Sequence, residues 1–381
     1  MQIVLLEQTS SRPEIRRVAS GGSHPGPLPP NQDVPGTSSP HSSDNQIPER
    51  LQTKLKRAEA EDSPEQRLNH YAEAACRLVR GNVQPDYDMT QLDIENLPTL
   101  IATENSRHPE LKLRQYTHPN QLLDDLATMP PGSFRALTPL VTHDGRLAQH
   151  HVMVSVNKAP GKAPTVVILE PSGTNEITLK LLCSLVNLTK ARGMDLSRFA
   201  IVEVGAQASQ NDCVMFCLNF ALKSLKHEAV FEKMHRNIAK GRGPTPNINL
   251  KTHLKQGKCW GSAVSVYGTD SVKLFFDKMG YASGPMALPP EFYKHTSSAT
   301  VARHVLAAAA DFAAPARTHV NSDRHPLPES LTERVEAFRV TRRASDSEEP
   351  ESYSASIEGF RLQEIRRAKA MIGTQLHSAE E

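Results

Sequence analysis

The middle of the chain alternates short apolar runs with longer amphipathic segments. Runs of strand length are rich in Val, Ile and Leu, whereas the longer segments repeat their apolar residues at helical spacing. In chain order they predict strands at about 134–142, 149–156 and 164–170, a helix at 175–192, a strand at 199–205 and helices at 212–225 and 227–238. Strands and helices mixed in this order predict an α/β or α+β core.

Helical patterns also lie on both sides of this core. They occupy about 50–62, 65–79, 91–106 and 120–127 before it, and 297–312 and 359–372 after it. We expect the two flanks to pack together. The predicted divisions are a leader at 1–48, a helical segment at 49–117, the core at 118–240, and core completion with further helices at 241–381.

The leader differs from the rest of the chain. From Ser10 to Pro48 it is rich in Ser, Pro and Gly and has too little apolar surface to fold, so we expect disorder. It lacks a basic-then-apolar secretory signal, and Gln2 stands where N-myristoylation requires Gly. No run of 18 apolar residues occurs, so we expect no membrane span.

Cys213 follows the predicted strand 199–205 and begins an apolar helical segment. A thiol in the first turn of a helix lies near unpaired backbone N–H groups and the positive end of the helix dipole, both of which favour the thiolate. Asp212 beside it would oppose ionisation. A protonated imidazole close to the thiol is therefore expected.

Two predicted strands supply candidate partners for this thiol. His151 precedes one buried run and Glu170 ends the next, so adjacent strands would bring an imidazole and an orienting carboxylate together. His150 competes with His151 for the same role. Gln207 is placed to offer its amide N–H to an oxyanion. Each residue also has an ordinary structural interpretation, and Cys217, one turn after Cys213, is expected in the core.

These residues together resemble the YopJ/AvrRxv family of effectors. The matching positions are His151, Glu170-Pro171, Gln207, Ser209, Asp212-Cys213 and the segment 288–296. His151 lies 19 positions before Glu170, and Glu170 lies 43 before Cys213. The similarity extends over roughly positions 65 to 375.

The resemblance implies a papain-like, Ulp1-type core of clan CE with helical regulatory flanks. His151 would act as base, Glu170 would orient it, and Cys213 would take the acetyl group of acetyl-CoA. The acceptors implied are Ser, Thr or Lys of host signalling or immune proteins, reached in the host cytoplasm after type III secretion with the leader as export address. Family members are activated by inositol hexakisphosphate.

Binding such a polyphosphate requires clustered cations. By resemblance, Lys294 and Arg107 are candidates, and Arg366 and Arg367 join them on composition. The ordinary alternative for each is a solvated surface cation. The contacts of acetyl-CoA stay unassigned because no phosphate-cradling glycine loop is present.

Composition limits the functions further. The 44 basic and 42 acidic residues leave a net charge of +2, which gives no overall nucleic-acid signature. The five cysteines lack a paired metal-ligand pattern, so we expect reduced thiols and no metal. Two alternatives to an acetyltransferase stay open: a cysteine protease or deSUMOylase on the same fold, and a catalytically silent protein that binds host partners.

Overall fold

The computed structural model describes most of the chain beyond the leader. The described residues are 47–59, 66–173, 176–207, 209, 211–243, 265, 266, 272, 278–310, 330–343 and 350–380. Most of the predicted leader and Cys259 lie outside these residues. No helix within them is long and apolar enough to cross a membrane.

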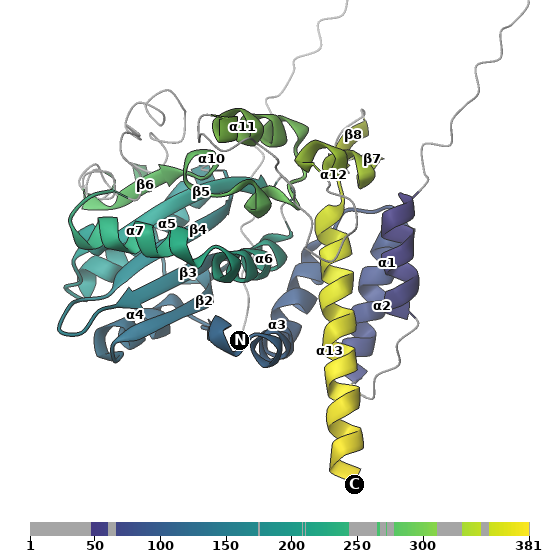
Figure 1. The fold of residues 1–381 in the computed structure, drawn as a ribbon, viewed down its shortest axis with the longest axis horizontal. Helices are drawn as coiled ribbons and strands as arrows, with labels where there is room; N and C mark the ends of the chain where they lie inside the picture. Colours follow the sequence, from purple (N-terminus) through teal and green to yellow (C-terminus); the bar gives the residue numbers. More distant parts are fainter. Residues whose placement is uncertain are drawn as a thin grey trace, which may run out of the picture. The chain divides into compact units, whose positions relative to one another are not determined.

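A six-stranded mixed sheet organises the core (Figure 1). Its strands lie in sequence order: β1 (Leu113–Gln115), β2 (Gly132–Val141), β3 (Leu147–Lys158), β4 (Thr165–Ser172), β5 (Phe199–Gln207) and β6 (Gly280–Ser283). The β2–β3 and β3–β4 pairs are antiparallel, whereas the β1–β2, β4–β5 and β5–β6 pairs are parallel. The predicted mixed α/β core is confirmed.

Helices cover both faces of the sheet, which explains why the sequences of its central strands are continuous apolar runs. One hydrophobic cluster joins residues of α4 (Pro119–Thr128) and α5 (Glu176–Ala191) to one face. The other cluster joins α6 (Cys213–Lys226) and α7 (Glu228–Ala239) to residues of the opposite face and of the flanking helices. In β4, every residue from Thr165 to Pro171 is buried.

The flanks pack together, as the sequence predicts. The flanking helices are α1 (Glu49–Glu59), α2 (Gln66–Arg80), α3 (Tyr87–Arg107) and α13 (Ser356–Glu380). Helix α13 contacts α1, α2, α3 and α6, so residues from the two ends of the sequence lie side by side (Figure 1). The ammonium of Lys54 donates to the carbonyl of Gly359 at 3.0 Å and to Oε1 of Gln363 at 3.0 Å.

Several short elements lack a clear sequence pattern and were not predicted. They are β1, β6, α10 (Gly284–Ala287), α12 (Leu331–Ala337) and the hairpin of β7 (Arg339–Arg343) and β8 (Pro350–Ser354), together with the 3-10 turns η1 (Pro109–Leu111), η2 (Leu196–Arg198) and η3 (Pro290–Tyr293). The predicted helix at 297–312 is α11 (Ala299–Ala310). Helix α3 begins four residues earlier than predicted, because Asp86 accepts a hydrogen bond from the Met89 amide and caps it.

Candidate active site

Cys213 is the first residue of α6, as the sequence predicts. Asp212 is the N-cap, and its carbonyl accepts the first helical hydrogen bond from the Phe216 amide at 3.0 Å. The Cys213 side chain is buried, and its Sγ lies 3.3 Å from the Gln149 carbonyl oxygen, to which it donates when protonated. Cys217 is fully buried one turn later, in the core position expected for it.

The structure corrects the assignment of the imidazole that Glu170 orients. The carboxylate of Glu170 binds His150 and not His151: Nε2 of His150 lies 2.8 Å from Oε1 and 2.9 Å from Oε2. Glu170 is fully buried and also accepts hydrogen bonds from the Ser172 amide at 3.0 Å and the Ser172 hydroxyl at 2.8 Å. These contacts fix the carboxylate against the imidazole of His150.

The register of β3 and β4 explains why His150, and not His151, reaches Glu170. The regular β3–β4 pairing stops at Met153 and Leu169, and the β2–β3 register shifts between Pro139 and Val141. Extended one step beyond Met153 and Leu169, the β3–β4 pairing sets Val152 opposite Glu170, so side-chain alternation puts His150 on the same face as Glu170 and His151 on the other. The pattern of apolar residues does not reveal this register, so the sequence alone could not choose between the two histidines.

His151 lies beside the thiol but has a different partner. Its Nδ1 lies 2.9 Å from the Gln149 carbonyl, which requires a proton on that nitrogen. Its own carbonyl accepts a hydrogen bond from Sγ of Cys217 at 3.3 Å. The ring of His151 is therefore held by the backbone of its own strand, and the His151 carbonyl is held by helix α6.

The charges at the site favour an ion pair. Burial alone raises the pKa of Cys213, but hydrogen bonds and positive charge from His150 and His151 outweigh it and lower the pKa to about 6. Burial lowers the pKa of His150, but Glu170 and the Cys213 sulfur outweigh it and raise the pKa to about 10. At neutral pH the site holds a thiolate beside an imidazolium.

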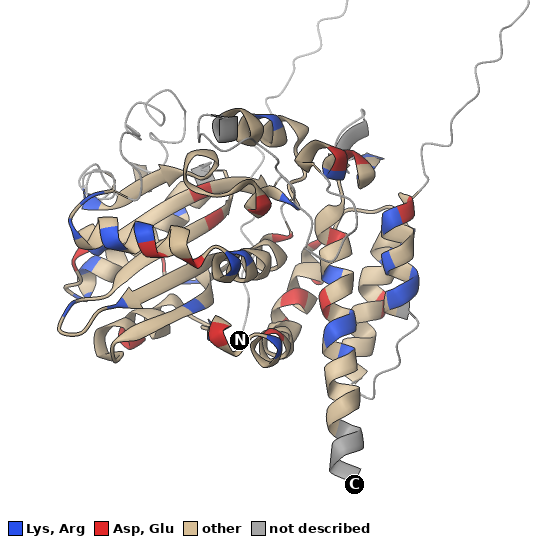
Figure 2. Ribbon diagram, in the orientation of Figure 1, with Lys and Arg blue, Asp and Glu red and all other residues tan. Residues whose placement is uncertain are grey.

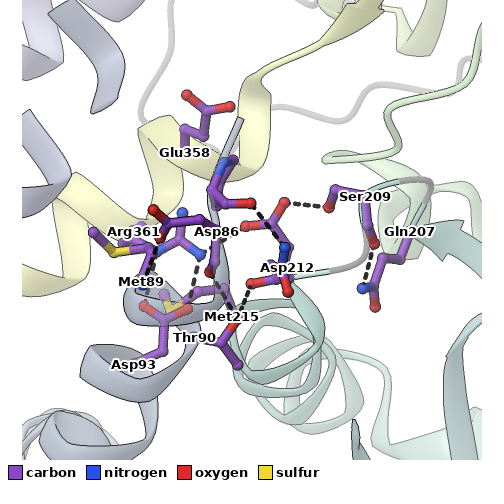
Figure 3. Close-up of polar contacts among 12 residues, drawn as sticks. Asp86, Met89, Thr90, Asp93, Gln207, Ser209, Asp212, Met215, Glu358 and Arg361 are labelled. Atoms are coloured by element: carbon purple, nitrogen blue, oxygen red, sulfur yellow. Dashed lines mark hydrogen bonds and ion pairs between the residues drawn. The ribbon is translucent and has the colours of Figure 1, made fainter. Parts of the chain in front are cut away.

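Gln207 ends β5 near the start of α6, but one of its amide N–H groups is already used. Its Nε2 donates to the Ser209 carbonyl at 2.6 Å, and its Oε1 is buried without a hydrogen-bond partner (Figure 3). Among the described residues this is the one hydrogen bond of Nε2, and a primary amide carries a second N–H that could bind a ligand.

A buried polar network behind the thiol was not predicted. Arg361 of α13 binds both Asp212 and Asp93 of α3, and the hydroxyl of Ser209 donates to Oδ2 of Asp212 (Figure 3). In the sequence, only Asp212 pointed to such a network, because a carboxylate next to a reactive thiol requires a compensating positive charge. An arginine 149 residues away cannot be found from local spacing.

A family comparison now identifies the chain. The model of the YopJ serine/threonine acetyltransferase family matches residues 68–367. The chain belongs to the YopJ serine/threonine acetyltransferase family. Its activity is therefore serine/threonine acetyl transfer, which favours the predicted enzyme over the protease and the catalytically silent alternatives.

Individual relatives agree with this assignment. The chain is 32% identical over 311 residues to the serine/threonine-protein acetyltransferase HopZ1a of Pseudomonas syringae pv. syringae, covering 80% of this chain and 81% of HopZ1a. It is 36% identical over 178 residues to a serine/threonine-protein acetyltransferase of Sinorhizobium fredii, covering 45% and 64% of the two chains. The crystal structure of HopZ1a in complex with IP6 and CoA matches with a TM-score of 0.70 and 29% identity, covering 85% of this chain and 99% of that one.

The YopJ-family segment 288–296 packs between α6 and the end of β5. The ring of Phe292 lies 6.0 Å from that of Phe220 and 5.9 Å from that of Phe231. The hydroxyl of Thr296 donates to the Ala206 carbonyl at 3.2 Å, next to Gln207. This segment therefore packs against the two elements, α6 and β5, that carry Cys213 and Gln207.

The four predicted phosphate-binding cations do not lie in one pocket. Arg107, Arg366 and Arg367 line a cavity of about 320 Å³ between α3 and α13. Arg107 and Arg367 bind buried carboxylates there, Glu104 and Glu364 respectively. Lys294 lies outside this cavity, in a separate cluster with Arg334, Lys223 and Lys54.

Lys294 lies in a cluster of mutually repelling cations. Burial, then the charges of Arg334, Lys223, Lys54 and Lys226, lower the pKa of Lys294 to about 6. Burial and the charge of Arg334 lower the pKa of Lys54 to about 7, although Glu364 opposes this. Lys54 also lines a cavity of about 190 Å³ with Arg366, so it connects this cluster to the cations of α13. Figure 2 shows Lys and Arg positions along both α1 and α13.

Proposed function

We propose that this chain transfers acetyl from acetyl-CoA through Cys213, with His150 as acid and base and Glu170 as its orienting carboxylate. The observation that carries the proposal is the bond between His150 and Glu170 beside a thiol whose pKa is lowered to about 6. This replaces His151 by His150 as the proposed base. The arrangement has the general form of a cysteine–histidine–acid triad.

Two transfer steps follow from this geometry. The Cys213 thiolate attacks the thioester carbonyl, a new S–C bond forms, and the CoA sulfur leaves with the proton of the His150 imidazolium. The neutral His150 then accepts the proton of an acceptor hydroxyl as that oxygen attacks the acetyl group on Cys213. The thiolate is released and the imidazolium is restored.

The oxyanion of each step requires hydrogen-bond donors near the sulfur. We propose the free N–H of the Gln207 amide and the unpaired backbone N–H groups at the start of α6 for this role. The donor bond from Gln207 to the Ser209 carbonyl would hold the amide in place.

Labelled acetyl-CoA tests the proposed triad. Wild-type protein with a serine-containing acceptor should show label on Cys213 in rapid quench and on the acceptor later. Cys213→Ala should lose both, and His150→Gln should slow both by about 10²–10⁴-fold. Cleavage of a ubiquitin-like precursor without any label would contradict the proposal and support a protease.

We infer a papain-like, Ulp1-type organisation for the core and host proteins as acceptors. The support is membership of the YopJ family and the similarity to HopZ1a. The same relationship supports delivery by type III secretion and action in the host cytoplasm. Mass spectrometry of acetyl marks on co-expressed host proteins, wild type against Cys213→Ala, identifies the acceptors and whether Lys is among them.

We propose inositol hexakisphosphate as the activator, bound by the cluster around Lys294 and Lys54 and by the neighbouring arginines of α3 and α13. A structure of the similar HopZ1a is a complex with IP6 and CoA. In this chain the fit comes from the repulsion among Lys294, Lys54 and Arg334, because buried like charges gain most from a polyanion. Arg366, Arg107 and Arg367 lie beyond Lys54 along the same flank contact.

Limited proteolysis with and without the polyphosphate tests this site. Protection of α1 and α13 is expected, because the ligand would draw their cations together. Unchanged cleavage of both flanks would contradict the proposal. Unphosphorylated inositol is the control.

A further inference from the structure

We propose that Arg361 of α13 is a positioning residue for Cys213, which holds the Asp212 carboxylate in place and offsets part of its charge beside the reacting sulfur. The proposal rests on the proposed role of Cys213 as the nucleophile. It adds a residue of the C-terminal flank to the machinery of the catalytic core.

The contacts of Arg361 are direct and buried (Figure 3). Its Nη2 donates to Oδ1 of Asp212 at 2.6 Å and to Oδ2 of Asp93 at 2.7 Å, while Nε donates to Oδ1 of Asp93 at 2.8 Å. The side chains of Arg361, Asp93 and Asp212 are each at most 2% exposed. The hydroxyl of Tyr71 donates to Oδ1 of Asp93 at 2.5 Å and completes the network.

The turn that precedes Cys213 is held from the flanks. The hydroxyl of Thr90 on α3 donates to the Asn211 carbonyl at 3.0 Å, and Nδ2 of Asn211 donates to the Pro85 carbonyl at 2.9 Å. Asp212 makes no side-chain cap to its own helix, so its carboxylate is oriented by Arg361 and by the Ser209 hydroxyl. The position of the first residue of α6 therefore depends on α3 and α13.

Charge gives Arg361 its second role. Asp212 is adjacent to Cys213 in sequence, and a carboxylate there opposes formation of a thiolate. The guanidinium of Arg361, shared between Asp212 and Asp93, offsets part of that charge from 2.6 Å, and solvent screens little because all three side chains are at most 2% exposed. If Arg361 is removed, the Asp212 carboxylate stays buried next to Cys213 in the sequence, with the Ser209 hydroxyl as its remaining side-chain partner among the described residues.

Other ionisable groups also act on the thiol and must be kept constant in a test. His150 and His151 on β3 lower the pKa of Cys213, Glu170 on β4 acts through His150, and Cys217 lies on the same helix. On the far side, Glu358 of α13 interacts with Asp212 but is bound by both terminal nitrogens of Arg342, at 2.7 and 2.9 Å. The variants used in the test leave His150, His151, Glu170, Cys217, Glu358 and Arg342 unchanged.

The test is the pH dependence of Cys213 alkylation by iodoacetamide, followed on the Cys213 peptide by mass spectrometry. Arg361→Gln should move the midpoint upward by about one pH unit. At pH 6 this lowers the thiolate fraction, and hence the alkylation rate, about fivefold. A structural role alone would lower the melting temperature without moving the midpoint.

Two further variants separate charge from packing. Tyr71→Phe removes a hydrogen bond from the same network without touching Asp212, and its midpoint should equal that of the wild type. In an Asp212→Asn background, the shift caused by Arg361→Gln should be much smaller, because the carboxylate adjacent to Cys213 is already absent and only Asp93 is left for Arg361 to compensate. An equal shift in both backgrounds, or no shift in either, would overturn the proposal.

Folding is checked by circular dichroism at each pH. If Arg361→Gln does not fold, Arg361→Lys keeps the charge but cannot bridge both carboxylates, and a smaller upward shift is expected. An unshifted midpoint in a folded Arg361→Lys protein would then count against the proposal. A wild-type midpoint near 9 would instead contradict the proposed thiolate–imidazolium pair, while a further rise on Arg361→Gln would still support the role of Arg361.

Discussion

At the thiol, burial and the neighbouring imidazoles act in opposite directions on the charge of Cys213. Burial raises its pKa, whereas His150 and His151 lower it to about 6, and the pKa of His150 rises to about 10. Between these values one proton is held by the imidazole instead of the sulfur. The reactive state of the site is therefore its ground state at neutral pH.

This charge distribution predicts how reactivity changes with pH. The rate of Cys213 alkylation should rise as pH increases through about 6, because the thiolate forms there, and should be level from about 7 to 9. Stopped-flow alkylation with peptide mapping measures it. A rate that still rises tenfold per unit between pH 7 and 8 would show an ordinary thiol.

The Cys213–His150 ion pair should make the free energy of unfolding depend little on pH over the same range. Cys213 has a folded pKa below its usual value, so its contribution grows with pH between about 6 and 9. His150 has a folded pKa above its usual value, so its contribution is lost between about 6.5 and 10. Between about 6.5 and 9 the two slopes cancel.

The two histidines can be separated by matched substitutions. His150→Gln should lower acetyl-enzyme formation by about 10²–10⁴-fold and move the alkylation midpoint toward 9, because the imidazolium and its bond to Glu170 are lost. His151→Gln should have the smaller effect on both, since its ring is bound to the Gln149 carbonyl. A larger loss from His151→Gln would restore His151 as the base.

At the scale of elements, close packing at α10 holds β5 against the segment that follows it. A Cβ at Gly284 would lie 2.3 Å from the Tyr293 hydroxyl, 2.7 Å from the Glu203 carbonyl oxygen and 2.8 Å from Cα of Val204. Backbone atoms cannot move aside as a flexible side chain can. Gly284 is therefore required for the path of the chain after β6.

Gly284→Ala should lower the free energy of unfolding by about 1–3 kcal/mol, because overpacking displaces α10 from β5. Gly373→Ala in α13 is the matched control, since a Cβ there meets nothing within 4 Å and Ala favours the helix by about 0.5–1 kcal/mol. Urea denaturation of both variants measures the difference. Equal stabilities would contradict the close approach at α10.

At the scale of the whole molecule, repulsion between the buried cations Lys294, Lys54 and Arg334 lowers the free energy of unfolding, and the size of this effect depends on pH. The folded pKa values of Lys294, about 6, and Lys54, about 7, lie below the usual value of 10.5. The unfolded chain binds more protons than the folded one over that window, so stability should rise as pH increases from about 6 to 10. The Cys213–His150 pair does not obscure this trend, because the opposite pH dependences of its two members cancel between about pH 6.5 and 9.

Melting temperatures with and without inositol hexakisphosphate test the cluster. The free protein should melt at higher temperature as pH increases from 6 to 9. The polyphosphate should raise the melting temperature most at pH 6, where the cations are charged. Lys294→Met should reduce both effects, whereas the exposed Lys233→Met on α7 should change neither. A ligand effect that is the same at pH 6 and 9 would contradict the cluster as its site.

Much of the core and part of the site were determined by local sequence. Continuous apolar runs, which are typical of strands buried on both faces, predicted β2 to β5. A strand followed by an apolar helix placed Cys213 in the first turn of α6. Short elements such as β1 and β6 escaped prediction because three or four residues carry too little periodicity, and their pairing with neighbouring strands fixes them.

Only the tertiary structure decided which histidine binds Glu170 and what compensates Asp212. The first depends on the register of β3 against β4, which puts His150 on the same face as Glu170 and which the apolar pattern of the sequence does not reveal. The second depends on Arg361, which reaches Asp212 from a helix 149 residues later. Sequence determines which groups the chain carries and which segments are buried, whereas the distances that create a charge pair arise when segments remote in sequence pack together.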